Sequence, residues 1–305
     1  MKVTNLDQYR AGIEAEKLAR LGLKFSAAGS LSSWQQYVGN LCPGNNGLLL
    51  AVSGALAAPV LELCGFPSYG LHFYGGKAES RSACVSAAAS VWGDGSSVQP
   101  WRSSAFTNPS LAGLMGALFL DNGDAALPEN LGSLIVEAGK GAPWAQANPK
   151  ATLFISAGPD AIEQAQCLQL PGVIAWHVLS IPIAADFAEL HGHRNAEIFT
   201  DYLKRNASKA HGVPAAAILQ SASSMGLENL KTVLSTFMDL FKAAADYDGA
   251  DEDQRVVLAY LALVCSVGEL ATTLDVTGWK EGAVIEAGLA CFRASVEPSP
   301  PDLAA

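Results

Sequence analysis

The sequence is poor in basic residues, and in charge altogether. Of 305 residues, 19 are Lys or Arg and 29 are Asp or Glu, which gives a formal net charge of −10. Nucleic-acid binding depends on Lys and Arg that displace counterions from phosphates, so this balance argues against a general nucleic-acid-binding surface. The most basic segment, residues 191–211, carries Arg194, Lys204, Arg205 and Lys209 at helical spacing, which is typical of a solvated helix face.

Membrane-spanning runs, a signal-peptide pattern and paired cysteine motifs are also missing. The apolar stretch 48–63 is interrupted by Ser53, Pro59 and Glu62, and residues 1–10 lack the apolar centre of a signal peptide. We therefore expect a cytoplasmic protein without membrane contact. The six cysteines show no C-x-x-C spacing, which favours buried thiols over disulfides or a zinc site.

Half of the residues are apolar, which is enough for a sizeable core. Their periodicity predicts strands around Leu71 and over residues 117–121 and 151–156. It predicts helices over 5–22, from Ser30 or Ser32 to Leu41, and over 47–64, 127–138, 196–210, 214–225, 227–245, 251–274 and 281–294. We divide the chain into a helical lead-in (1–46), an α/β core (47–190), a helical subdomain (191–297) and a disordered tail (298–305).

Residues 70–93 combine an alternating apolar strand, a Gly-Gly turn and an Ala-rich helix. Glycines and a Lys-Ser/Thr pair in such a loop let backbone N–H groups at the helix N-terminus hold a phosphate. The segment GGKAESRS matches the template G-x-x-x-x-G-K-[ST] at Gly75 and Ser82, whereas Ser80 replaces the second Gly and Arg81 replaces the Lys. Because most Gly-Gly turns bind nothing, the pattern alone indicates only a degenerate phosphate-binding loop.

Residues 29–93 resemble a bacterial family catalogued as domain of unknown function 927. Its members occur in replication proteins of phages, plasmids and integrative elements, and they resemble P-loop ATPases of the AAA+ and replicative-helicase type. Shorter similar segments, around Trp101-Arg102, at 190–192 and within 261–293, extend the resemblance to Arg293. The resemblance implies a P-loop NTPase (AAA+/helicase-like) α/β core with a parallel sheet and a C-terminal helical subdomain.

The same resemblance identifies further positions that carry chemistry in the family. Asp121, at the end of a buried strand, is placed to hold Mg²⁺, while Asn122 stands where a Glu would orient the attacking water. Ser156 takes the place of a sensor of the γ-phosphate. Residues 174–182 resemble a family strand, in which His177 takes the place of an Arg that stabilises charge. Two basic residues of the family are replaced by Ala142 and Trp144.

Together these replacements predict a protein that keeps the helicase-like framework while ATP hydrolysis is impaired, and that acts by binding a protein partner or as a subunit of a ring. The alternative is an active ATPase in which Arg81 or Lys77 serves the phosphates. A third interpretation, an unrelated α/β enzyme with Ser156 and His177 as nucleophile and base, lacks a G-x-S-x-G motif. The candidate nucleotide site comprises Gly75, Gly76, Lys77, Ser80, Arg81, Ser82, Asp121, Asn122, Ser156 and His177, with Ser82 and Asp121 as Mg²⁺ ligands if ATP binds.

Overall fold

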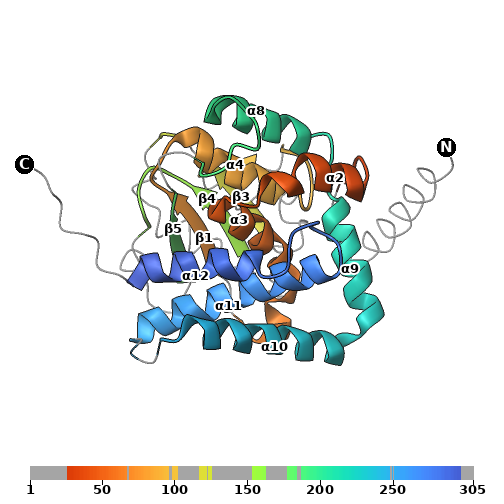
Figure 1. The fold of residues 1–305 in the computed structure, drawn as a ribbon, viewed down its shortest axis with the longest axis vertical. Helices are drawn as coiled ribbons and strands as arrows, with labels where there is room; N and C mark the ends of the chain where they lie inside the picture. Colours follow the sequence, from red (N-terminus) through yellow and green to blue (C-terminus); the bar gives the residue numbers. More distant parts are fainter. Residues whose placement is uncertain are drawn as a thin grey trace, which may run out of the picture.

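The structure is a computed structural model that describes residues 26–66, 69–95, 98–101, 117–121, 123–125, 153–162, 177–183, 187–247, 249 and 251–296. The predicted helices 5–22 and 127–138, Asn122, Ala142, Trp144 and the tail 298–305 lie outside these residues. The layers of the fold can be followed in Figure 1.

A parallel sheet forms the centre of the α/β part. Its strands are β1 (Tyr69–Tyr74), β2 (Val98–Gln99), β3 (Ala117–Asp121), β4 (Leu153–Ala157) and β5 (His177–Pro182). They lie in the order β2-β3-β4-β1-β5, and every pair of neighbours is parallel. The predicted α/β fold class is therefore confirmed. Because these strands are parallel, the chain leaves β1 and β3 at the same edge of the sheet. β4 lies between β1 and β3, so the two turns lie on either side of it.

The helices confirm most of the sequence predictions. They are α2 (Leu31–Tyr37), α3 (Asn46–Ala57), α4 (Ala78–Ala89), α8 (Ala196–Ala207), α9 (Val213–Met225), α10 (Leu227–Ala245), α11 (Glu252–Thr273) and α12 (Ala283–Val296). Ser30 is the N-cap of α2, and its hydroxyl accepts a hydrogen bond from the Ser33 amide. The helix ends at Tyr37, earlier than expected, and the chain continues as a 3-10 turn over Gly39–Leu41.

The helix predicted over residues 47–64 is shorter in the structure. α3 ends at Ala57, and two 3-10 turns, Ala58–Val60 and Glu62–Cys64, follow it. Pro59 accounts for the difference, because proline has no N–H to donate and its ring clashes with the preceding helical turn. The segment is almost wholly apolar because it lies inside the fold: every residue of α3 from Leu48 to Ala57 is buried.

α3 is the central helix of the molecule. It packs against α4, α11 and α12, and a Cβ at Gly54 would lie 2.4 Å from Leu71 of β1, so helix and sheet approach closely there. In Figure 1 α3 lies between the sheet and the layer formed by α10, α11 and α12. The C-terminal helices thus cover a helix that itself covers the sheet.

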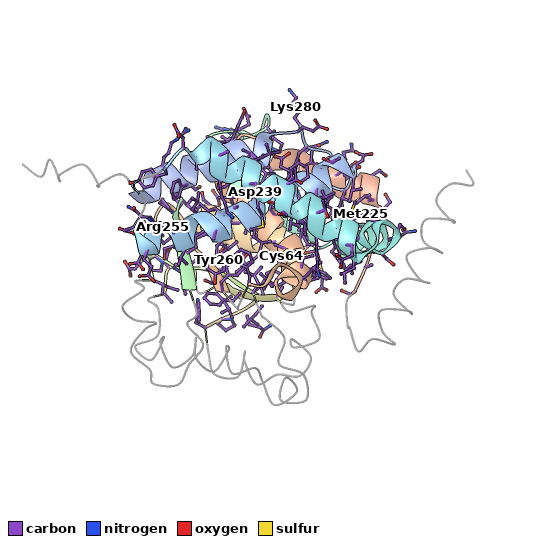
Figure 2. The ribbon with its side chains drawn as sticks, turned by 90° about the horizontal axis from the view of Figure 1, so that it is seen from below. Cys64, Met225, Asp239, Arg255, Tyr260 and Lys280 are labelled. Atoms are coloured by element: carbon purple, nitrogen blue, oxygen red, sulfur yellow. The ribbon has the colours of Figure 1, made fainter. Side chains whose placement is uncertain are left out.

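α11 is long and apolar enough to cross a membrane, but most of its apolar window is buried inside the fold. Tyr260 of α11 stacks on Tyr69 of β1, with ring centroids 4.3 Å apart. Figure 2 shows Tyr260 on α11 at the side where the strands lie. Core packing therefore accounts for the apolar composition of this helix.

The buried carboxylate of Glu269, on α11, holds the start of α12. One carboxylate oxygen accepts hydrogen bonds from the amides of Val284 (3.1 Å) and Ile285 (3.2 Å), and the other accepts from Gly282 (2.9 Å). Amides in the first turn of a helix have no partner within the helix, and a carboxylate both accepts from them and complements the helix dipole. This contact fixes α12 on α11.

Candidate functional site

The turn between β1 and α4 is shorter than the sequence predicts. Gly75 and Gly76 have φ values of 72° and 54°, a left-handed conformation that glycine adopts without strain, and Lys77 is the N-cap of α4. Because α4 begins at Ala78, the positions of Ser80 and Arg81 lie in helix rather than in loop. A serine in place of the second glycine of the template allows the helix to begin early.

Arg81 is buried, with 2% of its surface exposed, and its guanidinium binds the turn itself. Nη1 donates to the carbonyl oxygens of Gly75 (2.7 Å) and Gly76 (2.8 Å). Nη2 donates to the carbonyl oxygen of Gly123 (3.0 Å) and to a carboxylate oxygen of Asp124 (2.8 Å). These bonds connect the turn after β1 with the turn after β3.

The two predicted Mg²⁺ ligands lie together. The hydroxyl of Ser82, on α4, donates to one carboxylate oxygen of Asp121 at the end of β3. The Gly123 amide donates to the other oxygen at 2.8 Å. A carboxylate beside a hydroxyl is an oxygen donor set of the kind that Mg²⁺ binds together with water and substrate phosphates. The residues therefore fit a magnesium ion that would arrive with a nucleotide.

Ser156 contacts a histidine that the sequence analysis did not single out. Its hydroxyl lies 2.8 Å from Nδ1 of His72, on the neighbouring strand β1, and His72 Nε2 lies 2.9 Å from the carbonyl oxygen of Asp160. A carbonyl oxygen only accepts, so Nε2 carries the proton and the Ser156 hydroxyl donates to Nδ1. Burial lowers the pKa of His72 to about 4. The Ser156 proton is thus directed at His72, which leaves the predicted role of γ-phosphate sensor untested.

His177 lies away from the other candidate residues. It is the first residue of β5 and pairs with Tyr69, the first residue of β1. The turn follows Tyr74, at the other end of β1, which pairs with Pro182. At about 3.3 Å per strand residue, five residues separate the His177 backbone from the turn edge by roughly 16 Å. The structure therefore does not bring His177 to the nucleotide site. It also separates His177 from Ser156, because β1 lies between their strands.

Two residues of the site, His72 and Asp124, were not singled out from the sequence. His72 is a polar residue inside the apolar strand YGLHFY, where a buried imidazole requires hydrogen-bond partners. Asp124 is an acidic residue in the Asp-Asn-Gly-Asp turn after β3, and its contact with Arg81 depends on the strand order that brings β3 beside β4. Only the first had a signal in the sequence alone.

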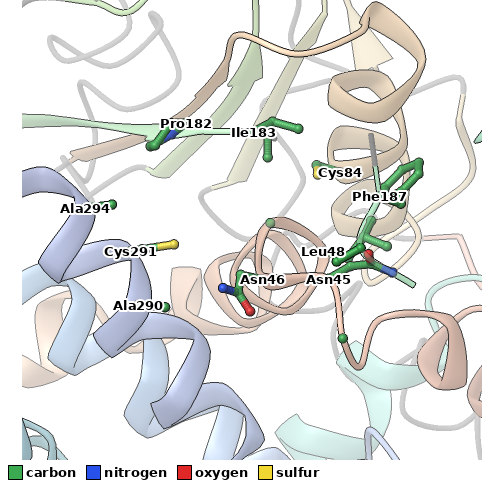
Figure 3. Close-up of a pocket in the computed structure, with 13 residues that line it drawn as sticks. Asn45, Asn46, Leu48, Cys84, Pro182, Ile183, Phe187, Ala290, Cys291 and Ala294 are labelled. Atoms are coloured by element: carbon green, nitrogen blue, oxygen red, sulfur yellow. The ribbon is translucent and has the colours of Figure 1, made fainter. Parts of the chain in front are cut away.

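A cavity of about 210 Å³ lies between the start of α3, the end of β5 and α12, with Cys84 of α4 in its wall. Figure 3 shows Cys84 and Cys291 on different sides of it. Burial raises the pKa of both thiols, that of Cys291 to about 12, so both stay protonated at neutral pH. The expectation of buried, free thiols is confirmed for Cys42, Cys84 and Cys265, whereas Cys64 and Cys291 are free and only partly buried. Cys167 lies outside the described residues. The cavity supplies no reactive group.

The part of the chain that contains the candidate site is similar to a known protein family. Residues 9–132 match the sequence model of the domain of unknown function DUF927. This is the family that the sequence resembles. The match includes β1, the Gly75-Gly76 turn, α4 and β3, and thus both turns that Arg81 connects. The search of curated proteins gave no match.

A solved structure described as "SCCmec type IV Cch - active helicase" is similar to the whole fold. The two share a TM-score of 0.60 and 13% sequence identity over 90% of this chain. The likeness covers 51% of the helicase, so this chain spans about half of its length. At this identity the comparison shows the fold alone, which is an α/β core with a parallel sheet followed by C-terminal helices.

Proposed function

We propose that this chain is a helicase-related protein of a mobile genetic element in which ATP hydrolysis is impaired, and that it acts by binding a protein partner or as a regulatory or structural subunit. One observation carries the proposal. The cation at the position of the phosphate-binding Lys, Arg81, is buried and bonded to the carbonyl oxygens of its own turn and to Asp124. A bound nucleotide would have to replace these bonds.

Physical chemistry supports impairment. Phosphoryl transfer is catalysed almost entirely by positioning and by electrostatic stabilisation, and the loss of one stabilising donor costs about 3 kcal/mol. Here the second glycine of the template is Ser80, the Lys is Arg81, and the Glu is Asn122. A planar guanidinium does not reproduce the compact ammonium of Lys, so charge alone does not restore the function. His177, in place of an Arg, lies outside the site.

The alternative function is an active, divergent ATP-dependent DNA helicase or replication ATPase. The hydrogen bond between Ser82 and Asp121 favours it, because this pair is intact and fits a nucleotide-bound Mg²⁺. In that case Arg81 or Lys77 would bind the phosphates. The two functions differ in whether ATP binds and is hydrolysed.

Net charge supports the choice of partner. A chain with a net charge of −10 repels nucleic acid at long range, which favours a protein partner, or a ring of like subunits, over extended DNA contact. We place the protein in the cytoplasm and propose no membrane contact. ATP and Mg²⁺ are cofactors only under the alternative function.

The experiment is calorimetric titration of the full chain with ATP and Mg²⁺, followed by phosphate release with and without single-stranded DNA. We expect no turnover. Arg205→Ala, an exposed arginine on α8, is the control for Arg81→Ala. Micromolar ATP binding that Arg81→Ala abolishes and Arg205→Ala does not, together with turnover, would establish the alternative.

A second experiment restores the template. The triple variant Ser80→Gly, Arg81→Lys, Asn122→Glu returns the missing groups to a site that keeps Ser82 and Asp121. If these substitutions cause the impairment, the triple variant gains measurable phosphate release over the wild type. Equal release by the two proteins would contradict that cause.

A further inference from the structure

Asp124 is an anion bound to the cation of the candidate site. Its carboxylate lies 2.8 Å from Nη2 of Arg81, and its side chain is 80% exposed, whereas that of Arg81 is 2% exposed. Arginine stays charged at any physiological pH, so this buried guanidinium requires an anionic or polar partner. Its other acceptors, Gly75, Gly76 and Gly123, are backbone carbonyls. Asp124 therefore supplies the negative charge in these bonds, from the solvent side.

Two buried polar atoms of adjacent residues in α4 have no hydrogen-bond partner among the residues that the structure describes. They are the hydroxyl of Ser80, which is fully buried, and Nε of Arg81. Ser80 is also in the first turn of α4, where backbone amides lack partners within the helix. Buried groups of this kind are normally paired, so the described residues leave hydrogen-bonding capacity unused around Arg81.

We propose that Asp124 acts as an internal latch: its carboxylate occupies the place on Arg81 that a phosphate oxygen of a nucleoside triphosphate would take, and it must leave before the triphosphate binds. The inference rests on the proposed function, because the latch is one cause of the weak triphosphate binding that the proposed function expects of the wild type. The exchange is a substitution of one oxyanion for another on the same guanidinium, and no covalent bond changes. Only the state in which Asp124 has left Arg81 binds triphosphate, and in the free chain this state is the minor one. The apparent affinity for triphosphate is therefore reduced in proportion to the fraction of chains in this state.

The proposal identifies Asp124 as a regulatory residue of the site. Its exposed carboxylate can turn away from Arg81 without opening the core, whereas Arg81 itself is held by three carbonyl oxygens. A partner that binds the turn after β3 would release Arg81 and so couple partner binding to nucleotide binding. Removal of the carboxylate charge should have the same effect as such a partner.

The test is calorimetric titration of the full chain with inorganic tripolyphosphate, in the presence and absence of Mg²⁺. Asp124→Asn keeps the size of the side chain and removes its charge. We expect this variant to bind tripolyphosphate about tenfold more tightly than the wild type. A tenfold change in affinity corresponds to the strength of one partly exposed, charge-assisted hydrogen bond. Addition of Arg81→Ala to Asp124→Asn should abolish the gain. Titration with ATP then shows whether the gain extends to a nucleotide.

The matched control is Glu79→Gln, which removes the same charge from an exposed residue in the first turn of α4. An equal gain in tripolyphosphate affinity in Glu79→Gln would show an effect of net charge alone and would overturn the latch. An affinity for tripolyphosphate that is unchanged in both Asp124→Asn and Asp124→Ser would overturn it as well. These outcomes leave the proposed function intact. By contrast, ATP turnover by the wild type overturns the proposed function and leaves the comparison of Asp124→Asn with Glu79→Gln as the test of the latch.

Discussion

At the scale of the residue, the site is held by polar side chains that bond to the protein itself. Arg81 bonds to the turn around it, Asp121 accepts from Ser82 and from the Gly123 amide, and Ser156 donates to His72. Each bond satisfies a buried group that would otherwise lose its hydration without compensation. The free energy of a nucleotide complex would have to exceed that of these internal bonds.

His72 gives the fold a pH dependence. Its pKa is about 4 in the folded chain, because burial disfavours the imidazolium, and the ordinary value is 6.5. Between these values the unfolded chain binds a proton that the folded chain does not, so stability is complete above pH 6.5 and falls as the pH falls towards 4. From pH 7.5 to pH 5.8 we expect a loss of about 1 kcal/mol in the free energy of unfolding.

Urea unfolding at the two pH values measures this loss. His72→Gln should reduce the pH-dependent difference by about that amount. Ser235→Ala, at an exposed residue without a titratable side chain, should leave it unchanged. An unaltered difference in His72→Gln would mean that another group causes the pH dependence.

At the scale of the element, close contact between helices depends on glycine. A Cβ at Gly268 of α11 would lie 2.3 Å from Oγ of Ser53 on α3 and 2.8 Å from Cγ1 of Val284 on α12. Gly288 of α12 is similar, because a Cβ there would lie 2.2 Å from Sγ of Cys265. Three helices approach one another at these two positions, and side chains there would separate them.

Gly268→Ala should therefore destabilise the protein although alanine favours helix. The gain in helix propensity is about 1 kcal/mol, and overpacking of a close helix contact costs about 1–3 kcal/mol, so we expect a net loss. Chemical denaturation measures it. Ser235→Ala, on the exposed side of α10, is the control and should be neutral or slightly stabilising. A Gly268→Ala variant more stable than the wild type would show that the helices can separate at little cost.

At the scale of the whole molecule, one hydrophobic core joins the sheet to the C-terminal helices. Leu71 of β1, Val52 of α3, Val264 of α11 and Val284 of α12 all belong to it. The N-terminal part is tied to the same unit, because Nε1 of Trp279 donates to the carbonyl oxygen of Gly39 at 2.8 Å. The helical part beyond residue 190 thus covers α3 in the manner of a core layer.

We expect the fragment of residues 1–190 not to fold cooperatively, because it exposes the faces of α3 that α11 and α12 cover. Circular dichroism during heating measures this. A chain without the predicted tail, residues 298–305, is the control and should melt as the full chain does. A sharp, cooperative transition in the 1–190 fragment would instead support two independently stable units.

The sequence by itself determined the elements whose signals are local. The amphipathic spacing of residues 227–245 predicted α10 with its observed bounds, and β3 was predicted as 117–121 because its apolar run ends at Asp121. The sequence limited the cap of α2 to Ser30 or Ser32, because a capping hydrogen bond spans only a few residues, and the structure assigns it to Ser30. The family resemblance led from these elements to the P-loop-like core.

Tertiary structure decided what depends on contacts between distant segments. The strand order placed Asp124 on Arg81, 43 residues away in the chain, and joined Ser156 to His72 across 84 residues. The register of β5 put His177 at the edge opposite the turn, although the family resemblance aligned it with an Arg that stabilises charge at the nucleotide. Sequence spacing fixes periodicity along one element, whereas the groups that meet at a site depend on how strands align and pack, which no local pattern specifies.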